Sequence, residues 1–292
     1  MQIRSQYVDT ALKPYQTHIK WRDTMNYAAA TGDDNPLYFD DGRPDGIIAP
    51  PMFSVAVTWP MVENLSQYLE IKDFPHEIMN FQVHYSEHLL FHRPIRPDDT
   101  LTVMGRIAAI LPHRAGTHFV LRLEAVDQEK KAVFTEHIGA MLRGVKCLDD
   151  GAGAEMLPRV PAAGDSLEPA WESSIKVAPL LPFIYDGCTN IVFPIHTSKK
   201  FARQVGLPGI ILQGTATLAL AARELINREA QGNSPQLEEL YCRFTGMVIP
   251  GSTMKIIAYR GGSADPEGSI HFDVLNAEGK KAIRSGYAGF GR

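Results

Sequence analysis

The spacing of apolar residues predicts two helices in the first 70 residues of the chain. Over residues 20–31, Trp21, Met25 and Ala29 fall on one helical face, and the segment ends at Gly32. The next segment is longer, and Pro60 inside it predicts a kink. The apolar face of this longer helix consists of Phe53, Val57, Met61, Leu65 and Leu69.

Strand-like runs follow these helices, over residues 99–111, 117–127 and 131–145. The same order returns later, with a helix over residues 215–229 and then three more strand-like runs. That helix carries Leu218, Ala222, Leu225 and Ile226 on its inner face, and the runs cover residues 252–260, 269–276 and 281–290. A helix followed by antiparallel strands, twice over, predicts an α+β fold with two antiparallel sheets, each wrapped on a central helix and paired side by side.

Residues 149–169 are rich in Gly, Ala and Pro and show no apolar period, which is typical of a linker. We therefore expect an N-terminal domain over residues 1–148 and a C-terminal domain over residues 170–292. The segments on either side of the linker repeat each other in three blocks, in the same order. Residues 27–38 align with 185–196, 46–51 with 209–214, and 97–103 with 250–256, at offsets of 158, 163 and 153.

Composition excludes several classes of protein. The net charge of −4 gives no basic footprint for nucleic acid, and no apolar run is long enough to span a membrane. The N-terminus lacks the apolar core of a signal peptide, so we expect a cytoplasmic protein. The three cysteines are far apart, and the histidine run His84, His88 and His92 lies in a strand-like segment, so no metal site is expected. No fingerprint for a redox cofactor is present.

The repeated blocks resemble the MaoC-like hot-dog family, which includes the (R)-specific 2-enoyl-CoA hydratases. The family signature is Gly-Asp-x-Asn-Pro-x-His, and it occurs here in two altered copies. In the first half, Gly32, Asp33, Asn35 and Pro36 match, but Tyr38 stands where histidine is expected. In the second half Pro194 and His196 match the signature. Asn190, Ile191 and Phe193 stand there where the glycine, the aspartate and the asparagine are expected.

The resemblance implies a double hot-dog fold that binds an acyl-coenzyme A thioester. Adding water to a 2-enoyl thioester needs a base for the water, an acid for C2, and donors for the thioester oxygen. In the family, backbone N–H groups at the start of the central helix bind that oxygen, and the matching position here is Gln213–Gly214.

The second half contains a candidate for the missing acid. Asp186 lies ten residues before His196, beside Tyr185, on the helix that leads into the motif. We hypothesise that Asp186 and His196 form the catalytic pair, with Asn190 as a polar partner, and that Tyr185 and Asn190 belong with Gln213 and Gly214 to the residues that contact the substrate. For Asp33, Asn35 and Tyr38 the alternative of a turn, cap and packing role stays open.

Three functions remain after these observations. The first is a hydratase or dehydratase acting at C2–C3 of an acyl-CoA, with no cofactor besides the coenzyme A of the substrate, in a homodimer of double hot-dog chains. The second is a hot-dog thioesterase, which releases free coenzyme A. The third is a non-catalytic acyl-CoA-binding partner subunit, which the split motif suggests.

Overall fold

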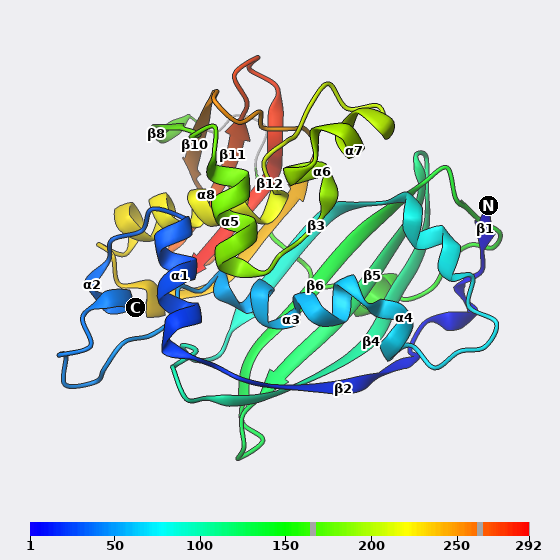
Figure 1. The fold of residues 1–292 in the computed structure, drawn as a ribbon, viewed down its shortest axis with the longest axis horizontal. Helices are drawn as coiled ribbons and strands as arrows, with labels where there is room; N and C mark the ends of the chain where they lie inside the picture. Colours follow the sequence, from blue (N-terminus) through cyan, green and yellow to red (C-terminus); the bar gives the residue numbers. More distant parts are fainter. Residues whose placement is uncertain (164–167, 262–264, 292) are drawn as a thin grey trace.

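The computed structural model describes residues 1–163, 168–261 and 265–291. Within these residues the chain builds one ten-stranded antiparallel sheet, in the order β2-β4-β5-β6-β3-β9-β12-β11-β10-β8 (Figure 1). The α+β prediction is confirmed. The strands are β2 (Ala11–His18), β3 (Gln82–Phe91), β4 (Thr100–His113), β5 (Gly116–Val126), β6 (Ala132–Arg143), β8 (Pro169–Lys176), β9 (Leu237–Phe244), β10 (Thr253–Arg260), β11 (Ser269–Leu275) and β12 (Lys281–Phe290).

The sheet divides into two five-stranded halves with the same strand order from the outer edge to the centre. The halves meet where β3 pairs with β9, and Glu87 there lies opposite Cys242. The two expected sheets are therefore joined into one, because each half supplies an edge strand whose free N–H and C=O groups the other half satisfies. The sequence repeat corresponds to this structural repeat.

The central helices lie on one face of the sheet. In the first half α3 (Phe53–Glu63) and α4 (Leu65–Tyr68) cross β3–β6 (Figure 1). The helix α3 runs through Pro60 and ends before Asn64, whose backbone is not helical, and the expected kink at Pro60 stays a prediction. The predicted apolar face is confirmed, since Phe53, Val57, Met61, Leu65 and Leu69 are all buried.

In the second half α8 (Gly214–Glu229) is the central helix. Every residue from Thr215 to Ala222 is buried, so its first two turns are covered on all sides. Such a helix is a core element of the fold rather than a surface helix. The predicted inner face, Leu218, Ala222, Leu225 and Ile226, is buried as expected.

The helices α1 (Trp21–Ala30) and α5 (Leu181–Thr189) are counterparts in the repeat and lie side by side (Figure 1). Their tyrosines meet: the hydroxyl oxygens of Tyr27 and Tyr185 are 3.0 Å apart, and both side chains are fully buried. Tyr27 and Tyr185 are equivalent in the repeat, 158 residues apart, and they contact each other where the two halves meet. A one-turn helix follows in each half, α2 (Pro36–Phe39) and α6 (Pro194–Thr197), and α7 (Lys199–Gln204) comes after α6.

The predicted linker begins alongside β4 of the first half. Ala152 bridges Ile110 of β4, and a short 3-10 turn follows at Ala154–Met156. At the start of this segment, β1 (Gln2–Ile3) pairs in parallel with β7 (Lys146–Cys147). Residues 164–167 lie outside the described residues, and the domain limits at 149 and 169 stay a prediction. A search of the described residues finds no helix long and apolar enough to cross a membrane.

Candidate active site

The head of α8 presents free hydrogen-bond donors. The backbone N–H groups of residues 214–216 make no hydrogen bond within the described chain, and the first intrahelical bond runs from Thr217 N to Gln213 O. Gly214 is closely packed, because a Cβ there would lie 3.3 Å from the ring of Phe244. Free N–H groups at the start of a 16-residue helix favour a negatively charged or polarised oxygen.

Gln213 anchors this helix head to α5. Its side-chain Nε2 donates to the backbone oxygen of Pro182 at 2.9 Å, and its own Oε1 is buried without a partner in the described chain. Gln213 is 1 % exposed. It therefore holds two segments of the second half together, while its carbonyl group stays free to accept a hydrogen bond.

His196 lies beside the approach to the same helix. Its Nδ1 is 2.9 Å from the backbone oxygen of Ile211. A carbonyl only accepts, so Nδ1 must carry the proton. Burial lowers the pKa of His196 to about 4, against the opposing effect of the bond to Ile211. The ring is therefore neutral at pH 7, and its Nε2 lone pair makes no hydrogen bond to any described residue.

Asp186 is half-buried on α5, and burial raises the pKa of its carboxyl. Its Oδ2 has no hydrogen-bond partner among the described residues. No hydrogen bond or ion pair in the described chain joins Asp186 to His196, so their pairing stays a prediction. Asn190 ends α5 in the left-handed conformation, at φ 56°, and its side chain is exposed. Asparagine tolerates this conformation better than other non-glycine residues.

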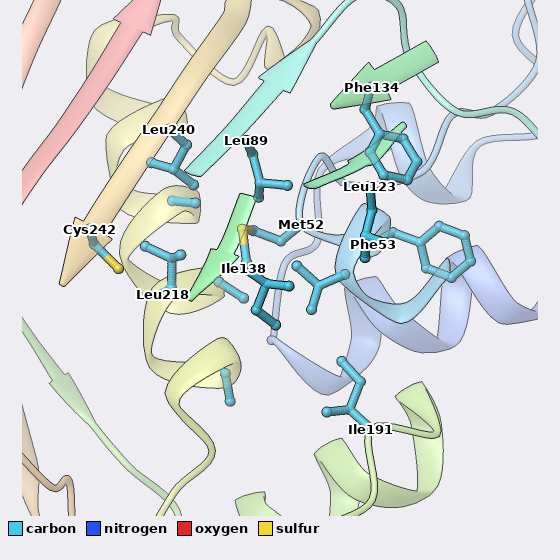
Figure 2. Close-up of a cluster of buried hydrophobic side chains, with 14 of the residues drawn as sticks. Met52, Phe53, Leu89, Leu123, Phe134, Ile138, Ile191, Leu218, Leu240 and Cys242 are labelled. Carbon is cyan, nitrogen blue, oxygen red and sulfur yellow. The ribbon is translucent and has the colours of Figure 1, made fainter. Parts of the chain in front are cut away.

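The position of the family's aspartate is part of the core in the second half. Ile191 is 2 % exposed and points toward Met52 and Ile138 among buried apolar side chains of both halves (Figure 2). Phe193, at the asparagine position, is half-buried. The loop between α5 and α6 thus supplies apolar contacts where the signature has polar groups.

The first-half motif fastens the two halves together. The Asn35 side chain caps α2 by accepting from Leu37 N, and its Nδ2 donates to Gly232 O at 2.6 Å. Arg223 of α8 donates to the backbone oxygens of Thr31 and Gly32. Asp33 is 7 % exposed and accepts from Asn35 N, and burial raises the pKa of its carboxyl. These hydrogen bonds of Asn35 support the alternative of a turn and cap role for this residue.

Two buried carboxyl groups were missed by the sequence analysis. Glu87 of β3 and Glu136 of β6 are both 0 % exposed, and none of their four oxygens makes a hydrogen bond of acceptable geometry within the described residues. Burial raises the pKa of each carboxyl well above its ordinary value. His84 Nε2 lies 3.1 Å from Glu87 Oε2, and the His84 ring is 4.4 Å from the ring of Phe244.

The histidine run on β3 does not converge. His84 approaches Glu87, His88 Nε2 lies 2.7 Å from Glu239 on the neighbouring strand, and His92 Nε2 lies 3.1 Å from Thr135. No group of three or more His, Cys, Asp or Glu side chains in the described part of the chain is placed to hold a metal ion.

Comparisons with known proteins match both halves. The MaoC like domain matches residues 169–281, and the FAS1-like dehydratase domain region matches residues 7–136. The chain is 27 % identical over 183 residues to the 3-hydroxyacyl-thioester dehydratase Y of Mycobacterium tuberculosis, and the match covers 61 % of each protein. The chain therefore spans less than two thirds of that relative.

Solved structures share the whole fold. A MaoC-like dehydratase from Phytophthora capsici superposes with a TM-score of 0.81 at 18 % identity, over 98 % of both chains. A Mycobacterium tuberculosis protein described as a double hot-dog fold gives 0.59 at 15 % identity, over 96 % of this chain and 94 % of that one. At such identities the likeness establishes the fold.

Proposed function

Because the chain belongs to the MaoC-like dehydratases with a double hot-dog fold, we propose that it adds or removes water at C2–C3 of an acyl-coenzyme A thioester. One observation carries the proposal: a neutral His196 with a free Nε2 is hydrogen-bonded to the backbone of Ile211, three residues before a helix head with three free N–H groups. This arrangement offers a base and an oxyanion site together, which the chemistry requires.

In the hydration direction, Nε2 of His196 takes a proton from water while the water oxygen bonds to C3. The C2–C3 π electrons move onto the thioester, and its oxygen accepts hydrogen bonds from the N–H groups at the head of α8. C2 then takes a proton from Asp186, which regains one from the protonated His196 through solvent. The sum is one water added, and no redox cofactor or metal enters the proposed reaction.

Asp186 is proposed as the acid because burial raises its pKa, which favours the protonated form, and because its Oδ2 has no partner in the described chain. The expected homodimer and cytoplasmic location stay predictions. A thioesterase could use the same helix head, with water attacking C1 instead of C3. The two reactions differ in their products, since hydrolysis releases free coenzyme A.

A panel of 2-enoyl- and 3-hydroxyacyl-CoA esters, scored by mass spectrometry for gain or loss of water, tests the proposal. We expect turnover with at least one ester, and a drop of about 10²–10⁴-fold in His196→Ala. His18→Ala is the matched control, because His18 is an exposed histidine of β2 in the other half. Turnover near the wild-type rate in His196→Ala would remove the assignment.

A further inference from the structure

Part of the surface of the second half consists of large apolar side chains in contact with solvent. On α5 they recur at helical spacing: Leu180, at the N-cap, is 65 % exposed, Phe183 is 42 % exposed and Ile184 is 46 % exposed. Val192, in the loop that leads from α5 to α6, is exposed as well. Single exposed apolar residues are ordinary, whereas a group of them marks an interaction surface.

The loop after β9 extends this surface. Met247 and Ile249 of the loop are exposed. The loop lies beside the segment before α5, because a Cβ at Gly251 would be 3.7 Å from the side chain of Pro179. Residues 244–254 contain no charged side chain. We refer to the exposed apolar residues of α5 and the two loops as the apolar face, which comprises Leu180, Phe183, Ile184, Val192, Met247 and Ile249.

A short basic helix accompanies the apolar face. Lys199, Lys200 and Arg203 of α7 are all exposed. α7 packs against α6, and α6 packs against α5 (Figure 1). Residues 177–213 contain these three cations and one carboxylate, Asp186, so the stretch has a net charge of +2 in a chain whose net charge is −4. The surface around α6 therefore combines apolar side chains with positive charge.

The fold does not require apolar residues at the exposed positions of α5 and its loop, as the internal repeat shows. Three of the four equivalent positions in the first half, at the same offset of 158, hold polar or charged residues. The equivalents are Arg22, Asn26 and Asp34, with Met25 at the fourth position. The apolar face is thus a property of the second half, which also contains the candidate active site.

The composition of this surface fits a lipid bilayer better than a protein. The apolar face consists of Leu, Ile, Val, Met and Phe, and two of the three cations of α7 are lysines. Protein interfaces favour Tyr, Trp and Arg and are depleted in lysine. At an anionic bilayer, the headgroups attract lysine and arginine while the acyl region accepts the apolar side chains. A second copy of the chain would present the same positive charge and no acidic counterpart to it.

We propose that the apolar face and α7 together bind the surface of an anionic lipid bilayer. The apolar side chains insert at the level of the headgroups, and the cations of α7 lie against the lipid phosphates. α6, which contains His196, packs between α5 and α7, so the candidate active site lies at the contact. The membrane contact does not rest on the proposed reaction. Its consequence for catalysis does: acyl thioesters whose chains partition into lipid gather where His196 lies.

Sedimentation of the full chain with lipid vesicles tests the proposal. One set of vesicles is pure phosphatidylcholine, and the other has equal parts of phosphatidylcholine and phosphatidylglycerol. We expect binding to the anionic set and little binding to the neutral set. Raising the salt from about 0.1 M to 1 M should release the protein, because the Debye length falls from about 10 Å to 3 Å. Absence of binding to the anionic vesicles would overturn the proposal.

The first variant removes the charges of α7: Lys199→Gln/Lys200→Gln/Arg203→Gln. Binding to anionic vesicles should weaken about a hundredfold, from roughly fivefold for each cation. The matched control removes the same charge from exposed lysines of the first half: Lys13→Gln/Lys72→Gln/Lys131→Gln. The control should leave binding within about twofold of the wild type, because these lysines lie outside the proposed contact.

The second variant removes the apolar side chains of α5: Leu180→Ser/Phe183→Ser/Ile184→Ser. Binding should weaken at least about tenfold, while the melting temperature changes little because these side chains are exposed in the free protein. Leu180→Trp guards against misfolding of this variant. It keeps the face apolar, and lipids with bromine on their acyl chains should quench its fluorescence. Binding that both triple variants leave unchanged, or an unquenched Leu180→Trp, would overturn the proposal.

Two further results would overturn the proposal and identify another occupant. The first is a dimer that the serine variant dissociates in analytical ultracentrifugation, without vesicle binding, which assigns the face to a second copy of the chain. The second is binding of an acidic acyl carrier protein that the glutamine variant abolishes, again without vesicle binding. None of these measurements requires hydration of an enoyl-CoA, so failure of the proposed function is recognised separately.

Discussion

The buried pair Glu87 and Glu136 should make the stability of the protein fall as the pH rises above the ordinary pKa of a glutamate. Burial raises the pKa of both carboxyls, so the folded protein holds protons that the unfolded chain releases. Stability from such groups is fully present below the unfolded pKa, and it declines as the pH rises toward the folded pKa. Replacing both residues by glutamine keeps their shape and removes the titration.

The size of the effect follows from proton linkage. Over each pH unit in which one carboxyl stays protonated when folded and ionised when unfolded, the free energy of unfolding falls by about 1.4 kcal/mol. The useful window is pH 7.5–8.5, because most histidine side chains are already neutral in the unfolded chain there. The histidines with a lowered pKa, which add an opposite slope at lower pH, are His84, His118, His137 and His196.

Urea denaturation at pH 7.5, 8.0 and 8.5 measures this slope. Between pH 7.5 and 8.5 the free energy of unfolding of the wild type should decrease. In the double variant Glu87→Gln/Glu136→Gln this decrease should be smaller, by about 1.4 kcal/mol for each carboxyl that stays protonated in the folded wild type. Glu129→Gln is the control, because the Glu129 side chain is 72 % exposed and should leave the slope unchanged. Parallel slopes for the wild type and the double variant would refute the reasoning.

Three further predictions concern the second half and the contact between the two buried tyrosines. Because the pKa of His196 is lowered to about 4, ionisation of this histidine should leave kcat/KM unchanged from pH 8 to 5 and should lower it about tenfold per pH unit below pH 4. A pH–rate profile in which kcat/KM declines near pH 6.5 would contradict this prediction. Gly214→Ala brings a Cβ to 3.3 Å from the Phe244 ring, so turnover should drop while the melting temperature changes little, as steady-state kinetics and thermal denaturation can show. Tyr27→Phe leaves the Tyr185 hydroxyl buried without this partner and should cost about 1–3 kcal/mol in urea denaturation; an unchanged midpoint would count against the tyrosine pair.

The central elements were predictable because their patterns are strong. The apolar face of the first central helix is buried as predicted, and the strand-like runs over 99–111 and 252–260 became β4 and β10. The break at Asn64 was not predictable from Pro60, because a proline can remain in a helix when its neighbours tolerate the missing bond. The edge strand β2 was missed as well, since its polar, largely exposed residues resemble a loop.

The candidate site was only partly visible in the sequence. The repeat located the two motif copies, and the resemblance to the family signature then led to His196 and to Gly214 at the head of the second central helix. The contact that sets the histidine tautomer comes from the carbonyl of Ile211, and no side-chain pattern reveals a backbone partner. Glu87 and Glu136 did carry a signal: each is in phase with apolar residues of its strand, Leu89 and Ile138, and such positions face the core.

One experiment addresses the proposed reaction most directly: turnover of 2-butenoyl-CoA in ¹⁸O-labelled water, followed by mass spectrometry of the products. The proposed reaction puts the label on C3 of an intact 3-hydroxybutyryl-CoA, and His196→Ala should suppress that product. Label in a free carboxylic acid, with coenzyme A released, would contradict the account.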